Sequence, residues 1–101
     1  MKPAEIEKYR VSNMSSYRGG GDSVANQFLI TINTDKGTKR IFQSYKTIIA
    51  VMDEDGNVTL DKNKWDYSPT TSRYRNQFLR EKTAETRRKI NSGVYTLANL
   101  N

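Results

Sequence analysis

The sequence predicts an α+β domain with a small antiparallel sheet of three to five strands, covered on one face by two short helices in the C-terminal half. Two observations lead to this prediction. In the first half of the chain, apolar and polar side chains alternate with a period of two, which is typical of strands. From residue 70 onward, apolar side chains recur at helical spacing instead. The 101 residues fit one domain, residues 1–101.

The strand predictions rest on β-branched and aromatic side chains between turn signals. Gly37 and the pair Asp55-Gly56 mark turns, so the flanking segments are expected to form two hairpins. Residues 9–14 are a candidate edge strand. The four segments with the clearest strand composition are residues 27–33, 39–45, 47–52 and 57–61.

The first predicted helix follows Pro69, which blocks a continuing strand, and runs to about Arg80. Thr70, Thr71 or Ser72 is expected to cap it. Tyr74 and Phe78 are four residues apart and therefore share one face of this helix.

The second predicted helix covers residues 84–91, with Thr83 as its cap and Gly93 as its left-handed stop. The apolar residues that follow, 94–100, fit either a strand or a packed tail. Two segments are expected to be flexible: a candidate N-terminal tail, residues 1–8, and a loop at residues 15–23 that contains three consecutive glycines.

The composition excludes several classes of function. The chain has no cysteine and no histidine, so it offers no thiolate nucleophile, imidazole base, disulfide or ordinary zinc site. We therefore expect no cofactor and no metal, and a protein that is not an enzyme. No apolar run is long enough to span a bilayer, and the first ten residues lack the apolar stretch of a signal peptide. The expected location is the cytoplasm.

The net charge of +6 is concentrated in one segment. Residues 1–70 hold ten basic and nine acidic side chains, whereas residues 71–91 hold seven basic and two acidic ones. Arginines bind phosphates and a tyrosine can stack on bases, so this segment is a candidate nucleic-acid or partner surface. Its candidate residues are Arg73, Tyr74, Arg75, Arg80, Lys82, Arg87, Arg88 and Lys89. The competing interpretation is a solvated helix face whose aromatic side chains point into the core.

Two smaller groups support other hypotheses. A secondary interface for a protein partner is predicted at the glycine-rich loop and the acidic turn, through Tyr17, Arg18, Asp53, Glu54 and Asp55. Asp61 and Asp66, with the lysines near them, suggest a metal-dependent nuclease only if two or three carboxylates converge on rigid elements.

Five segments together resemble a family of small proteins, without assigned activity, from tailed bacteriophages and related mobile elements. The resemblance lies in residues 9–19, 26–32, 42–50, 60–79 and 85–101. It transfers no functional residue. It implies a phage accessory protein that acts in the cytoplasm of a host bacterial cell and redirects host machinery, including defence nucleoproteins.

We therefore expect a non-enzymatic protein that binds nucleic acid, or a host complex that carries nucleic acid, through the basic segment 71–91. The alternative is an anti-defence inhibitor of the anti-CRISPR kind, which contacts a host nucleoprotein machine through protein surfaces.

Overall fold

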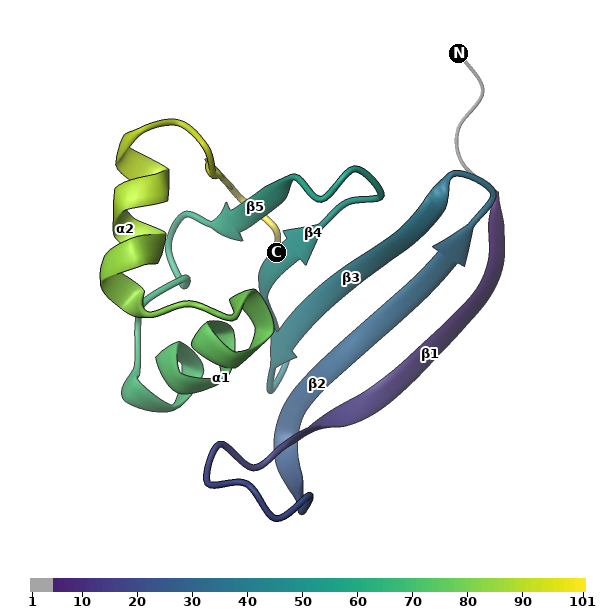
Figure 1. Cartoon of the computed structure of the whole chain (residues 1–101), viewed down its shortest axis with the longest axis horizontal. Helices are drawn as coiled ribbons and strands as arrows, with labels where there is room; N and C mark the ends of the chain where they lie inside the picture. The colour runs from purple at the N-terminus through teal and green to yellow at the C-terminus, as the bar shows by residue number, and fades with distance from the viewer. Residues whose placement is uncertain (1–4) are drawn as a thin grey trace.

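The computed structural model describes residues 5–101, which form a six-stranded sheet and two helices (Figure 1). The strands lie in the sheet in the order in which they occur in the chain. The elements are β1 (Ile6–Ser15), β2 (Ser23–Thr34), β3 (Gly37–Ser44), β4 (Thr47–Met52), β5 (Val58–Asp61), α1 (Pro69–Leu79), α2 (Thr83–Asn91) and β6 (Thr96–Ala98).

The sheet is mixed, so the prediction of three to five antiparallel strands is wrong. β1 to β5 pair in antiparallel fashion, but β6 runs parallel to β5. The cause is the connection between these last two strands. It contains both helices, and a helical crossover returns the chain in the same direction.

The N-terminal half also has more strand than expected. β1 includes residues 6–8 of the segment predicted to be flexible, whereas residues 1–4 of that segment lie outside the described residues. The loop between β1 and β2 is shortened to residues 16–22. Hydrogen bonds from Ser16 N to Asp22 O and from Gly19 N to Ser16 O close its base.

Both helices lie where they were expected, but their caps differ. Ser68 caps α1: its Oγ accepts a hydrogen bond from Thr71 N at 3.1 Å, and Pro69 occupies the first turn. α2 begins after Lys82 without a side-chain cap. Thr83 is not the cap because its hydroxyl oxygen accepts hydrogen bonds from the preceding helix instead.

One face of the sheet carries the core. Phe42, Ala50 and Leu60 are adjacent on β3, β4 and β5, and each is fully buried. Tyr74 and Leu79 of α1 belong to the same cluster. We call this side of the sheet the helix face and the opposite side the open face.

The three long strands extend past the helices as an arm (Figure 1). We define the arm as residues 6–12 of β1, 29–34 of β2 and 37–41 of β3. The core cluster stops at the base of the arm, with Leu29 at its border. The arm and α1 are therefore placed to form two walls of a concave surface.

Candidate functional site

The structure separates the predicted basic segment into buried, paired and free side chains. Tyr74 is buried in the core, so its ring cannot stack on a base. Arg75 is fully buried as well. For these two residues, the predicted binding role is replaced by a structural one.

Arg75 joins both helices to the β5–α1 connection. Its Nη1 donates to Trp65 O at 2.5 Å and to Asp66 Oδ1 at 3.1 Å, and its Nη2 donates to Thr83 Oγ1 at 2.6 Å. The guanidinium also lies 5.1 Å from the centre of the Trp65 ring. A planar, five-donor side chain suits this position because it can satisfy several acceptors at once.

The three basic residues of α2 are held in ion pairs. Arg87 contacts Asp66 Oδ2 at 3.1 Å, Arg88 pairs with Glu85, and Lys89 contacts Glu81 Oε1 at 2.8 Å. Their charges are therefore largely compensated within the protein, which makes them weak candidates for phosphate contacts.

Two of the acids that pair with them, Glu81 and Asp66, have pKa values below their ordinary range. Burial raises the pKa of Glu81, but hydrogen bonds from Lys89, Thr86 and Tyr95 outweigh it, so the pKa lies below its ordinary value. Burial also raises the pKa of Asp66, and its bonds with Ser72 and the two arginines again bring the net pKa down.

Three predicted residues are exposed and, within the described residues, lie outside any ion pair: Arg73, Arg80 and Lys82. Arg73 lies 4.8 Å above the ring of Tyr17, whose edge packs against Tyr74. The side chain of Arg18 donates a hydrogen bond to the Tyr17 hydroxyl, and that bond lowers the pKa of Tyr17. Loop 16–22 is thereby connected to the first turns of α1.

A groove of about 400 Å³ lies between α1 and the arm. Gln77, Phe78 and Arg80 line it from the end of α1, and Leu29 and Arg40 line it from the arm. Arg73, Gln77 and Arg80 are spaced at i, i+4 and i+7, so they follow one stripe along α1. Gln77 Nε2 donates to Ser15 O at 3.1 Å, which shows that this stripe faces β1.

The arm contributes arginines that the sequence analysis missed. Arg10, Thr31 and Arg40 form one row across β1, β2 and β3, on the helix face. Two strand spacings place the Cα atoms of the arginines about 10 Å apart. Within the described residues, no acidic side chain pairs with Arg10, Arg40 or Arg80. Arg40 and Arg80 line the groove, and Arg10 lies beside it in the same row of the arm as Arg40. We call Arg10, Arg40 and Arg80 the groove arginines.

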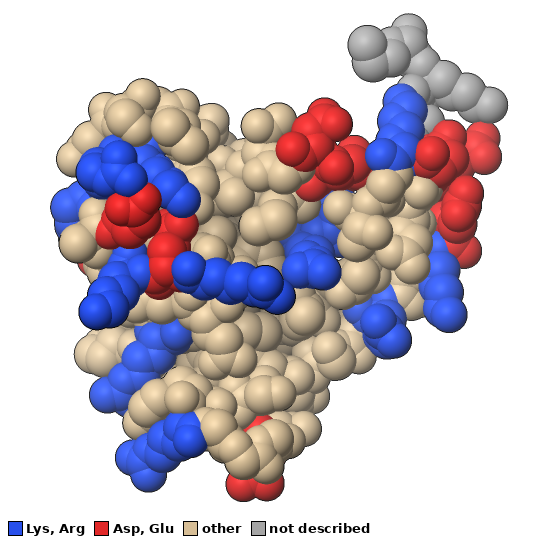
Figure 2. Space-filling model, viewed as in Figure 1, with Lys and Arg blue, Asp and Glu red and all other residues tan. Residues whose placement is uncertain are grey.

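The charges of the molecule are unevenly distributed. Figure 2 shows Lys and Arg side chains in the hollow beside the arm and, mixed with acidic ones, over the helical part, and it shows several Asp and Glu side chains at the far end of the arm. That end contains the β2–β3 turn, and Glu54 of the β4–β5 turn packs beside Gly37. Because several of the acids lie at the end of the arm, residues 1–70 have almost no net charge although the groove itself is basic.

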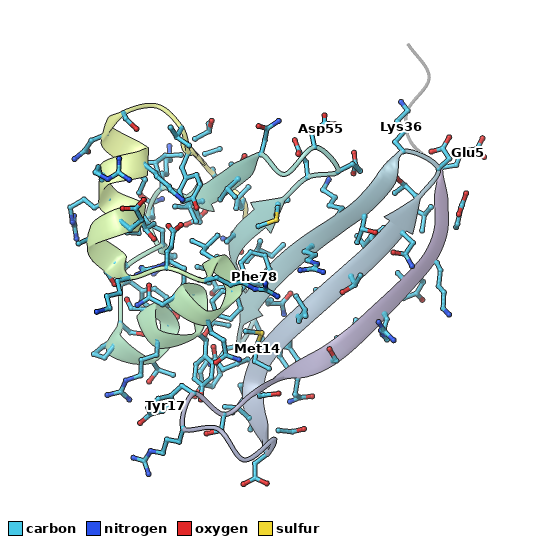
Figure 3. All side chains as sticks on the ribbon, in the orientation of Figure 1. Glu5, Met14, Tyr17, Lys36, Asp55 and Phe78 are labelled. Atoms are coloured by element: carbon cyan, nitrogen blue, oxygen red, sulfur yellow. The ribbon has the colours of Figure 1, made fainter. Side chains whose placement is uncertain are left out.

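The predicted secondary interface is not one surface. Tyr17 lies on loop 16–22, whereas Asp55 lies at the opposite end of the molecule (Figure 3). Asp53 Oδ1 accepts hydrogen bonds from Asp55 N and Asn57 N, so this carboxylate stabilises its own turn.

The two aspartates considered for a metal are committed to other contacts. Asp61 is buried and accepts hydrogen bonds from Leu100 N at 2.9 Å and Asn63 N at 3.2 Å. Asp66 binds the side chains of Ser72, Arg75 and Arg87. Within residues 5–101, no group of three or more acidic side chains is arranged to hold a metal ion.

None of the helices formed by residues 5–101 is both long and apolar enough to cross a membrane. Comparisons with curated proteins and with solved structures give no match. The model of a protein family of unknown function, DUF8033, matches residues 10–93, a range that includes the groove arginines and both helices. The chain belongs to this family.

Proposed function

We propose that this protein binds a nucleic-acid strand in the groove between α1 and the arm, without catalysing a reaction. The observation that carries the proposal is the set of groove arginines, Arg10, Arg40 and Arg80, none of which has an acidic partner within the described residues. Uncompensated guanidinium groups along a concave surface are suited to successive phosphates of a backbone.

The neutral residues of the groove support the same function. Gln77, whose amide already donates one hydrogen bond to Ser15 O, can donate its second N–H to sugar or phosphate oxygens, and the half-buried ring of Phe78 offers an apolar contact for a base. Arg18, Arg73 and Tyr17 extend the basic surface along α1 from the groove. The binding residues proposed from the sequence are thus partly replaced by residues of the arm.

The backbone of Arg80 supplies a well-controlled variant. Arg80 has a φ of 58° at the C-terminal end of α1, in the left-handed region that glycine adopts without strain. Arg80→Gly therefore removes the guanidinium without adding backbone strain. Loss of binding in this variant cannot be attributed to a disrupted helix end if its melting temperature is no lower than that of the wild type.

The test measures fluorescence anisotropy of labelled single- and double-stranded DNA and RNA across a salt series. The groove variant combines Arg10→Ala, Arg40→Ala and Arg80→Gly. Three lost phosphate contacts should reduce the slope of log K against log salt by roughly 2 to 3, and the affinity by about tenfold or more.

The control variant replaces Lys62, Arg87 and Arg88 with Ala, which removes the same formal charge outside the groove. We expect it to keep most of the wild-type affinity. Equal losses in both variants would mean that net charge, not the groove, causes binding. If the wild type does not bind any of the four nucleic acids at low salt, the proposal is wrong and inhibition of a host complex by protein contact becomes the better hypothesis.

A phage or mobile-element origin, with action in the cytoplasm of a host bacterial cell, belongs to the same proposal. It is supported by the sequence resemblance described above. In that setting, the binding partner is a host or phage nucleic acid, either free or within a defence complex.

A further inference from the structure

The open face of the sheet carries a continuous apolar surface that no part of the core covers. In the rows of paired residues, Val11, Ile30, Ile41 and Val51 lie side by side across β1 to β4. Tyr9 and Ile32 continue this surface in the next row, which ends at Lys39, and Phe28 lies on the other side between Asn13 and Gln43. None of these residues belongs to the core cluster or packs against it.

The apolar side chains of this surface are most exposed on the edge strand β1. Tyr9 is 71% exposed, Val11 is 56% exposed and Ile6, paired with Thr34 on the same face, is 63% exposed. Antiparallel sheets usually place apolar residues on the covered face and polar residues on the solvated one. Here the order is reversed on the arm: the cations Arg10 and Arg40 lie on the helix face, and the apolar side chains lie on the open face.

We infer that two copies of this chain associate through their open faces, as the two sheets of a β-sandwich do. The open face is large enough for a specific dimer interface. Four strands about 4.8 Å apart and four rows of residues about 6.6 Å apart give a footprint of roughly 500 Å². Two copies together then bury about 1,000 Å² or more, which is the lower limit for a specific interface.

The charges favour a second copy and indicate its orientation. In the regularly paired rows of the arm, Lys39 is the charged residue on the open face, and Glu7 lies in the bulge between Ile6 and Lys8, so little like charge would be brought together. The tip of the arm has more acids than bases, with Glu5, Glu7, Asp35 and Glu54 against Lys8 and Lys36. The opposite end of the molecule holds Arg18 and Lys46 in its loops, beside Asp22. An antiparallel arrangement brings each acidic tip over the basic end of the other copy, whereas a parallel one would place the two acidic tips together.

The test is the oligomeric state, measured by sedimentation equilibrium over a range of protein concentrations. The wild type should be a dimer. The double variant Tyr9→Gln and Val11→Gln keeps the charge and changes two exposed side chains of the open face, so it should weaken the dimer at least about tenfold. The control is Val94→Gln, a position that is 62% exposed and lies outside the sheet, and it should remain a dimer.

A wild type that remains a monomer at high micromolar concentration would overturn the inference, and so would a double variant that associates as strongly as the wild type. If the double variant does not show a cooperative thermal melt, the single change Ile6→Gln on the same face takes its place with the same expectation. The inference does not depend on nucleic-acid binding: the groove variant, altered on the helix face, should stay dimeric.

Discussion

Replacing Arg75 with Ala should destabilise the protein strongly, although the sequence suggested that this residue binds a partner. The side chain is fully buried, and its guanidinium contacts Trp65 O, Asp66 Oδ1 and Thr83 Oγ1. Its removal takes the donor from Trp65 O, removes one of the donors to Thr83 Oγ1 and leaves Asp66 with one fewer cation. Removal of one partner from a buried charged network typically costs about 3–5 kcal/mol.

The measurement is urea denaturation followed by circular dichroism, with thermal melts in parallel. A loss of 3 kcal/mol in a domain of this size lowers the melting temperature by roughly 12–24 °C. Arg75→Lys keeps the charge but loses the planar guanidinium, so its loss in free energy of unfolding should lie between that of Arg75→Ala and zero. Arg88→Ala is the matched control. Arg88 pairs with Glu85 on the surface, and its removal should change stability by less than about 1 kcal/mol.

If Arg75→Ala lowered the free energy of unfolding by less than about 1 kcal/mol, with an unchanged slope of that free energy against urea concentration, the structural role assigned to Arg75 would be refuted. A second measurement separates the two roles. At a temperature where Arg75→Lys is folded, its affinity for nucleic acid should match that of the wild type, because the buried side chain cannot reach a ligand.

Two further predictions concern the helices. Ser68→Ala removes the cap of α1 and should lower the free energy of unfolding by about 1 kcal/mol in urea denaturation, and an unchanged value would contradict the observed bond to Thr71 N. The pKa of Glu81 is lower in the folded protein than its ordinary value of about 4.3, so its ionised form stabilises the fold above that pH. This contribution is lost as the pH falls through the lowered pKa. The stability difference between the wild type and Glu81→Gln should therefore be largest at neutral pH and shrink in acid, and a difference that grew in acid would contradict this assignment.

The positions of the helices and central strands were predictable because local signals specify them. The alternation in residues 27–33 and the turn at Gly37 are signals from neighbouring parts of the chain. The same is true of Pro69 in the first turn of α1 and of Gly93, which has a positive φ just after α2. The sequence does not specify β6, because its three residues acquire strand geometry only by pairing with β5, which is distant in the sequence. Local pattern contains no information about such a partner.

The candidate site was harder to predict because charge alone does not show which cations are free. Arg75 and Arg87 look like binding residues until the fold brings Asp66 to both of them. Arg10 and Arg40 look unremarkable in a segment of nearly neutral charge, yet the register of three strands places them in one row. For Arg10 a signal was available, because Lys8 and Arg10 alternate with Tyr9 and Val11 and so mark one face of a strand. Arg40 directly follows Lys39, so no such alternation marks it.

The arrangement of the two faces leads to a prediction that connects both proposals. The groove arginines lie on the helix face and the apolar residues on the open face, so a dimer formed through the open faces carries its two grooves on its outer sides. A long strand that reaches both grooves gains affinity because its second contact is intramolecular, whereas a short strand fills one groove only.

The double variant Tyr9→Gln and Val11→Gln should therefore lose affinity for a long single strand but not for a short one, in the same anisotropy assay. The groove variant should lose affinity for both lengths. Equal affinity of the double variant and the wild type for all lengths would mean that the two grooves do not act on one strand, even if the dimer forms. A loss of affinity for short strands as well would mean that the open face itself touches the ligand, which would contradict the assignment of the two faces to different partners.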